Sequence, residues 1–168
     1  MPALRSTPLA LACLLGLAAF TSTGAARADA FFDQVAVANA AEIQAAQNAL
    51  AKTSFDDTRT FAQRLIDDHT ALGQQLTALA AQQHIDLPDQ ATLDARVAKL
   101  QSAPAKGMSF DAGYADAQVK AHEDAVKLFE NEVQAATTPE IKAFAEQNAP
   151  MMQHHLQMAK RLAKTHRK

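Results

Sequence analysis

The amino-acid sequence predicts an all-α fold built from four long amphipathic helices, and three observations support this. Hydrophobic residues make up 48% of the 168 residues, and much of that share is alanine, a strong helix former. Aromatic residues account for only 5%, and there are only 5 glycines, which argues against a β-sandwich or a β-barrel. Apolar residues also recur at three- and four-residue spacing over long stretches, as they do in amphipathic helices. The length allows one domain of ordinary size.

The first 28 residues have the layout of a secretory signal peptide. Arg5 precedes an apolar run over residues 8–20, and small residues follow that run. Ala26-Arg27-Ala28 fits the small-x-small rule, so we expect cleavage after Ala28, with the site after Ala30 as second choice. The apolar run is too short to span a membrane. We therefore expect a protein exported to the periplasm or cell envelope, with no transmembrane helix after cleavage.

The composition of the expected mature domain, residues 29–168, excludes several function classes. Removal of Arg5 and Arg27 takes the formal net charge from −2 to about −4, and no basic face indicates binding to nucleic acid. The single cysteine, Cys13, is lost with the signal peptide, which excludes disulfides, thiolate metal sites and cysteine nucleophiles. No serine lies in a G-x-S-x-G setting, which makes a serine hydrolase unexpected. An envelope partner or a homo-oligomer is left open.

A first helical hairpin is expected at the start of the mature domain. One helix runs from about Phe31 to Lys52, and a second ends at about Gln83. Thr53-Ser54 breaks the helical pattern, and Ser54 followed by Asp57 resembles an N-cap with an acid in the first turn. A break of about two residues between long helices forces them to be antiparallel.

Residues 84–108 are expected to form the long connection to a second hairpin. A short helix within this connection is predicted by Leu93, Val97 and Leu100, which share one side at helical spacing. A loop over residues 102–107 is expected to follow it.

The remaining chain predicts the second hairpin. Ser109 caps a third helix that runs to about Ala135. Thr138-Pro139-Glu140 is a helix-start signal, with a hydroxyl cap, a proline at the first position and an acid. The fourth helix runs to about Lys164, and Pro150 within it is expected to cause a kink. Two hairpins joined by a long crossover with a short extra helix give the ferritin-like form of the four-helix bundle.

One potential metal ligand interrupts or borders the apolar stripe of each long helix. Glu42 lies beside the stripe of the first helix, and His69, His122 and His155 lie within the stripes of the other three. The rise per residue places Glu42 and His69 within roughly 6 Å in height, and His122 and His155 within roughly 4.5 Å. Asp68 belongs either to a solvated acidic face or to the hydrogen-bonded shell that orients an imidazole.

Three arrangements of these four residues are open. A buried carboxylate beside imidazoles costs several kcal/mol unless it is compensated, and a divalent cation bound by all four would compensate it. A dry Glu–His hydrogen-bond network would do so as well, in a structural or interaction module of the cell envelope. In the third arrangement the four groups lie far apart.

The types of donor narrow the choice of metal. None of the residues three positions before a histidine is acidic, so the E-x-x-H pairs of a di-iron carboxylate centre are absent. Three imidazoles with one carboxylate suit zinc or another mononuclear divalent ion, such as iron or copper. Our first hypothesis is therefore a non-catalytic or weakly catalytic metal-binding bundle.

A second constellation on the fourth helix suits copper(I). It combines thioethers with imidazoles, at Met151, Met152, His154, His155 and Met158. The other interpretation is that the methionines fill an irregular core near Pro150.

Several motifs occur in the order found in one bacterial exported family. They are Phe61-Ala62 with Asp67-Asp68-His69, Phe110-Asp111-Ala112-Gly113-Tyr114, Lys120-Ala121-His122-Glu123, and Pro150 with His155-Leu156. The chain thereby resembles the family catalogued as domain of unknown function 4142 over nearly all of residues 31–163. The resemblance implies a ferritin-like four-helix bundle outside the cytoplasm, with the family's polar positions at Glu42, Asp68-His69, His122-Glu123 and His155-Leu156. It implies no established activity.

Overall fold

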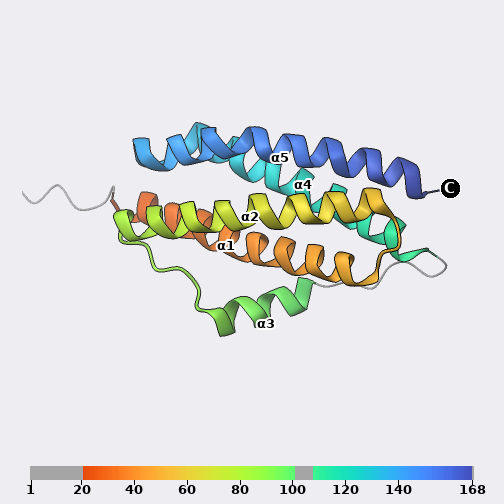
Figure 1. Ribbon diagram of the computed structural model, residues 1–168. Helices are drawn as coiled ribbons and strands as arrows, with labels where there is room; N and C mark the ends of the chain where they lie inside the picture. Colours follow the sequence, from red (N-terminus) through yellow and green to blue (C-terminus); the bar gives the residue numbers. More distant parts are fainter. Residues whose placement is uncertain (1–20, 101–107, 168) are drawn as a thin grey trace, which may run out of the picture.

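The computed structural model describes residues 21–100 and 108–167, and these form an all-α fold (Figure 1). Its helices are α1 (Thr21–Lys52), α2 (Asp56–Gln83), α3 (Gln90–Leu100), α4 (Phe110–Ala135) and α5 (Pro139–His166). The helices α1 and α2 pack as one hairpin, α4 and α5 pack as the other, and α3 lies along the outside of α1. The predicted bundle of two hairpins with a long crossover and a short extra helix is confirmed.

Some sequence-based predictions concern residues outside the described ranges. Most of the expected signal peptide, residues 1–20 with Cys13, lies there, and so does the predicted loop over residues 102–107. Among the helices of the described ranges, none combines the length and the apolar character needed to cross a membrane.

Two helix starts confirm the predicted caps. The Ser109 hydroxyl accepts a hydrogen bond from the backbone N–H of Ala112 at 3.2 Å, at the start of α4. The Thr138 hydroxyl accepts one from the N–H of Ile141 at 3.3 Å, and Pro139 begins α5. Each cap satisfies a backbone donor that has no partner inside its helix, which defines where the two helices of the second hairpin begin.

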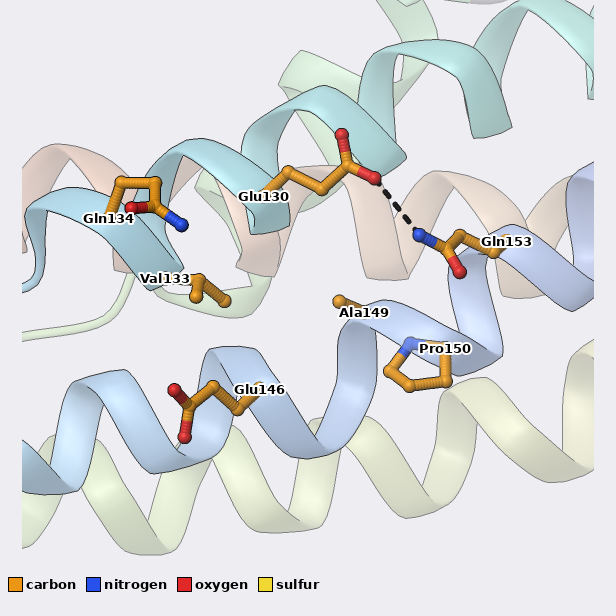
Figure 2. Close-up of a pocket in the computed structure, with 7 residues that line it drawn as sticks. All are labelled: Glu130, Val133, Gln134, Glu146, Ala149, Pro150 and Gln153. Carbon is orange, nitrogen blue, oxygen red and sulfur yellow. Dashed lines mark hydrogen bonds between the residues drawn. The ribbon is translucent and has the colours of Figure 1, made fainter.

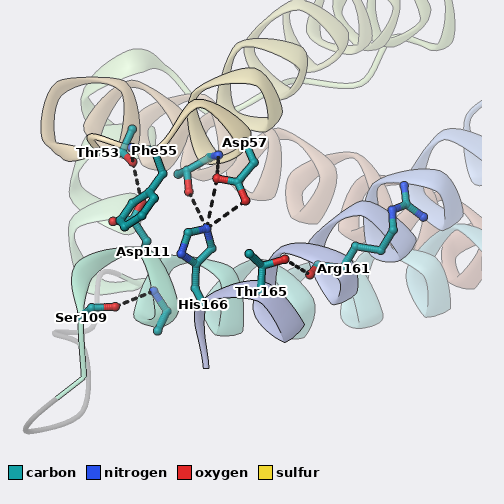
Figure 3. Close-up of polar contacts among 10 residues, drawn as sticks. Thr53, Phe55, Asp57, Ser109, Asp111, Arg161, Thr165 and His166 are labelled. Carbon is teal, nitrogen blue, oxygen red and sulfur yellow. Dashed lines mark hydrogen bonds and ion pairs between the residues drawn. The ribbon is translucent and has the colours of Figure 1, made fainter. Parts of the chain in front are cut away.

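The start of α2 shows that the predicted Ser54 cap is wrong. Phe55 is the residue before this helix, and it makes no side-chain capping bond. The connection is held instead by Thr53, whose hydroxyl accepts from the backbone N–H of Phe55 and donates to the carboxylate of Asp111 on α4 (Figure 3). Thr53 is buried where Ser54 is exposed, so the inward-facing hydroxyl joins the hairpin to α4.

Other boundaries differ from the predictions at helix ends. The helix α1 begins at Thr21 rather than Phe31, because an alanine-rich segment continues it and Ala28 packs in the core at 4% exposure. Leu100 ends α3 and is 59% exposed, so it does not share the buried side of Val97. The helix α5 extends to His166 rather than Lys164.

The helix α5 continues through Pro150, whose ring is exposed. Pro150 lines a groove between α4 and α5, where Gln153 donates a hydrogen bond to Glu130 at 2.9 Å (Figure 2). The expected loss of a backbone hydrogen bond at this proline therefore falls on the outer side of the bundle.

The apolar core consists of two clusters separated along the bundle axis. The first contains four phenylalanine rings with centroid separations of 5.6 to 6.5 Å, those of Phe31, Phe32, Phe129 and Phe144. The second has smaller side chains and contains Leu65, with several alanines from all four long helices. Along every long helix, the residues between these two clusters include buried polar side chains.

A matched pair of leucines tests the first cluster. We expect Leu76→Ala to lower the free energy of unfolding by about 2–5 kcal/mol, because Leu76 is 2% exposed and its loss leaves a cavity. We expect Leu100→Ala to change it by less than about 0.5 kcal/mol, because that side chain is 59% exposed. Urea unfolding of both variants measures the difference, and equal effects would contradict the assignment of the core.

Candidate metal centre

A layer of buried polar side chains crosses the middle of the bundle between the two apolar clusters. We call this set the polar layer, and its members come from all four long helices: Asn39, Glu42, His69, Gln118, His122 and His155. On each helix these residues follow one cluster and precede the other, so the helical period that buries the apolar residues also buries the polar ones.

The three histidines of the polar layer meet at its centre. The ring centroids are separated by 5.9 Å for His69 and His122, 5.5 Å for His69 and His155, and 5.3 Å for His122 and His155. One ring nitrogen of each lies within 4.8 Å of the other two. All three side chains are at most 3% exposed. The two hairpins therefore pack in a register that places their histidines together.

Each histidine has one ring nitrogen hydrogen-bonded to an oxygen. The three pairs are His69 Nδ1 with Asn39 Oδ1 at 3.0 Å, His122 Nδ1 with the Gln118 backbone oxygen at 3.0 Å, and His155 Nε2 with Asp68 Oδ2 at 2.9 Å. Because the amide oxygen of Asn39, a backbone oxygen and a carboxylate all only accept, the bonded nitrogens must be the N–H donors. The opposite nitrogens, Nε2 of His69, Nε2 of His122 and Nδ1 of His155, have no partner. Each neutral ring thus has a free lone pair at its unbonded nitrogen.

Burial keeps the imidazoles of His69 and His155 neutral. It lowers the pKa of His69 to about 3, and the neighbouring His122 and His155 add to that effect. Burial also lowers the pKa of His155 to about 4, although the hydrogen bond to Asp68 opposes it. The unprotonated ring is the form that binds a metal ion, so His69 and His155 are in their ligand form at neutral pH.

Asp68 orients the imidazole of His155 through a hydrogen bond, which was one of its two predicted roles. Burial disfavours its charge, but hydrogen bonds from Arg64 and His155 outweigh that effect and lower the pKa of the carboxyl. The side chain is 21% exposed, so it lies between the surface pair with Arg64 and the buried ring of His155. A carboxylate behind a histidine is the usual support of a metal-binding imidazole.

Glu42 belongs to the polar layer but not to the group of three convergent nitrogens. Its side chain is 8% exposed, and the group within 4.8 Å contains the three histidines without this carboxylate. Burial raises the pKa of Glu42, while His122 and a hydrogen bond with Gln118 act in the opposite direction. One carboxylate oxygen, Oε2, has no partner. The assignment of Glu42 as a fourth ligand stays a prediction.

Two supporting residues are not among the predicted site residues. Asn39 lies among Val35, Ala46 and other apolar positions of its helix, and an amide in such a stripe is a signal of a buried hydrogen bond. Gln118 supports His122 through its backbone oxygen, which every residue type offers, so no sequence signal marks that role.

The methionines of α5 are distributed between the two apolar clusters. Met152 is 1% exposed within the first cluster, Met151 packs against it, and Met158 packs against the second. His154 is exposed. This distribution favours core packing over the predicted copper(I) constellation.

The neutral histidines predict a stability loss in acid for the metal-free protein. The folded pKa values of His69 and His155 lie below about 6.5, the unfolded value, so the contribution of these two residues is present above pH 6.5. As pH falls below 6.5 the unfolded chain binds protons first, and each of these two histidines then lowers the unfolding free energy by about 1.4 kcal/mol per pH unit. Urea unfolding in chelator from pH 7 to pH 5 measures this slope.

Variants assign that slope to the site. We expect His69→Gln to remove about half of it, because the variant keeps only one of the two strongly shifted groups. His84→Asn is the control, because His84 is exposed and Asn tolerates its left-handed backbone at φ 56°. A slope that His84→Asn removes and His69→Gln leaves intact would contradict the assignment.

Comparisons with known proteins agree with this fold. The structure is similar to that of a conserved hypothetical protein, rv2844, from Mycobacterium tuberculosis, with a TM-score of 0.65 and 15% sequence identity over 83% of this chain and 93% of that chain. At that identity the similarity shows the fold alone. No curated protein matches the chain. Residues 16–162 match the family described as Domain of unknown function (DUF4142), and the chain belongs to that family.

Proposed function

We propose that the protein binds one divalent transition-metal ion through His69, His122 and His155. The observation that supports this best is that three buried histidines from three helices each place a ring nitrogen within 4.8 Å of the others, and that each ring has one nitrogen without a hydrogen-bond partner. Imidazole nitrogens suit zinc, iron and copper, and the donor set contains no thiolate that would narrow the choice.

The spacing of the nitrogens supports binding of an ion of this size. Metal–nitrogen bonds of about 2.0–2.1 Å place two tetrahedral ligands about 3.4 Å apart. The three nitrogens lie within 4.8 Å of one another, so small rotations of the rings bring them to that distance. Without an ion, three lone pairs face one another in a buried space, where unpaired polar atoms are unfavourable.

The location of the site favours binding over rapid turnover of a substrate. The histidines are enclosed between two apolar clusters, and the grooves found on the bundle surface are lined by other residues. A metal at this position would join α2 of the first hairpin to α4 and α5 of the second. We propose a non-catalytic or weakly catalytic metal-binding bundle.

Calorimetry and thermal unfolding test metal binding directly. We expect the chelator-stripped protein to take up one Zn²⁺, Co²⁺ or Cu²⁺ per chain and to unfold at a higher temperature. At a free metal concentration of about 100 times Kd, the gain of about 2.7 kcal/mol corresponds to roughly 5–10 °C.

Two single substitutions distinguish the site from adventitious binding. His122→Ala removes a convergent nitrogen, and we expect it to abolish both the uptake and the shift. His154→Ala removes an exposed imidazole next to the site and is expected to leave both unchanged. If the wild-type protein takes up none of these ions, the proposal fails and the histidines form an internal network in a structural module of the cell envelope.

We also propose that the chain is exported through residues 1–28. The supporting observation is the order of a basic residue, an apolar run and Ala26-Arg27-Ala28 in the sequence. Cleavage after Ala28 would leave Phe31 and Phe32, which belong to the first apolar cluster, in the mature chain. The fold described above is compatible with that processing, because most of α1 follows the site.

Replacement of either of two alanines by lysine tests export and locates the cleavage site. We expect amino-terminal sequencing of the protein from the periplasmic fraction to begin at Asp29. Ala28→Lys is expected to block cleavage at both candidate sites, whereas Ala26→Lys blocks only the one after Ala28, because the enzyme requires small residues one and three positions before the cut. Unprocessed wild-type protein in the cytoplasmic fraction would contradict export.

A further inference from the structure

Six of the seven buried side-chain atoms without a hydrogen-bond partner in the described residues belong to the polar layer or to Tyr114 on α4. Three of the six are the imidazole nitrogens already described. The other three are oxygens: Glu42 Oε2, Gln118 Oε1 and the Tyr114 hydroxyl. Buried polar atoms in folded proteins are usually satisfied by protein, an ordered water or an ion. A group of three unpaired oxygens next to three unpaired nitrogens therefore indicates a further ligand.

These oxygens lie on one side of the histidine group. Tyr114, Gln118 and His122 are spaced four residues apart on α4, so they share one face of that helix. Gln118 is hydrogen-bonded to Glu42 on α1, His122 acts on the pKa of Glu42, and Glu42 in turn raises the pKa of Tyr114. The oxygens are thus gathered between α1 and α4, beside His122.

Three histidines leave one position of a tetrahedral metal open. Catalytic zinc sites have this arrangement, with three protein ligands and a water or substrate at the fourth position. The carboxylate of Glu42 lies outside that group of three nitrogens, although it is the acid of the polar layer and His122 acts on its pKa. A carboxylate oxygen too far from a metal to coordinate it directly can still be linked to it by a water. Such a water lies about 2.0 Å from the metal and about 2.7 Å from the carboxylate oxygen.

We infer that the fourth ligand is an exchangeable water or small anion held by Glu42, and that Glu42 is a positioning residue rather than a metal ligand. This inference rests on the proposed metal binding. Gln118 fixes the arrangement from both sides, since its backbone oxygen accepts from His122 and its side chain is bonded to Glu42. The unpaired Oε2 of Glu42 is the atom that accepts a hydrogen bond from the water.

The inference separates this site from a closed structural metal site. Four protein ligands would leave no place for an external molecule, whereas a water can be replaced by an anion such as azide. The ligand class is therefore a small oxygen or nitrogen donor that fits a buried space. Larger substrates are excluded, because all three histidines are at most 3% exposed.

Cobalt(II) is the probe, because its visible spectrum depends on the number and kind of its ligands. We expect the wild-type protein to bind one Co²⁺. We expect the visible spectrum of the bound Co²⁺ to change when the protein is titrated with azide. We expect Glu42→Gln to keep the Co²⁺ site, with affinity lowered about tenfold as for outer-shell partners of metal ligands, and to change the affinity for azide.

Glu132→Gln is the matched control. Glu132 is a buried carboxylate on the same helix as His122, with an unpaired oxygen, and it lies about 15 Å farther along α4. We expect this variant to have the wild-type Co²⁺ and azide affinities. Circular dichroism of the metal-free variants shows whether each is folded, and the wild-type azide titration tests the inference even if Glu42→Gln does not fold.

The outcomes distinguish failure of the proposed metal binding from failure of the inference about Glu42. A wild-type protein that takes up no Co²⁺ refutes the proposed metal binding and this inference with it. Co²⁺ uptake with a spectrum that azide leaves unchanged, and loss of uptake in the folded Glu42→Gln variant, would retain metal binding and overturn the inference, since Glu42 would then be the fourth ligand.

Discussion

The orientation of three buried imidazoles is the constraint on which the centre of this bundle depends. Each ring is fixed by a hydrogen bond from one nitrogen to an oxygen, so the direction of its other nitrogen is set as well. If one acceptor were lost, its ring could rotate and the convergence would disappear. The acceptors come from a side chain of α1, the backbone of α4 and a side chain of α2, so the helices must pack in this register for the site to exist.

This constraint is unfavourable for stability alone. A layer of apolar side chains of similar volume would join the two apolar clusters into one continuous core, and buried polar groups replaced in this way often leave a protein equally or more stable. The bundle instead retains seven buried atoms without partners in its described part, six of them in or beside one layer. Local disagreement with the rules that favour folding is typical of functional sites. The polar layer is therefore better explained by a ligand than by folding.

The sequence predicted the helices and the candidate ligands for the same physical reason. Apolar residues at helical spacing indicate a buried face, and His69, His122 and His155 stood out because they occupy positions on that face. Ser109 and Thr138 were recognised as caps because the cap is local in the sequence.

Local sequence patterns could not predict the contacts between distant segments. Whether the histidines of the two hairpins share a height depends on how the hairpins pack, which no local pattern encodes. At the first turn the hydrogen bonds are made by Thr53 and not by Ser54, because Thr53 reaches Asp111 of α4. The orientation of His122 depends on a backbone oxygen. The prediction of the site was therefore good for residue types and incomplete for geometry.

A metal ion at the polar layer would act as a cross-link between the two hairpins. The described residues contain no cysteine, and the hairpins are joined in sequence only through the long connection that contains α3. His69 belongs to the first hairpin, and His122 and His155 belong to the second, so one ion would tie together segments more than 50 residues apart. If the ion binds the folded state alone, it stabilises that state by mass action, whereas a disulfide stabilises a fold by restricting the unfolded chain. Unlike a disulfide, such a link would depend on the supply of metal and on pH, because protons compete for the same nitrogens. The polar layer would then couple the stability of the bundle to the metal content of its surroundings.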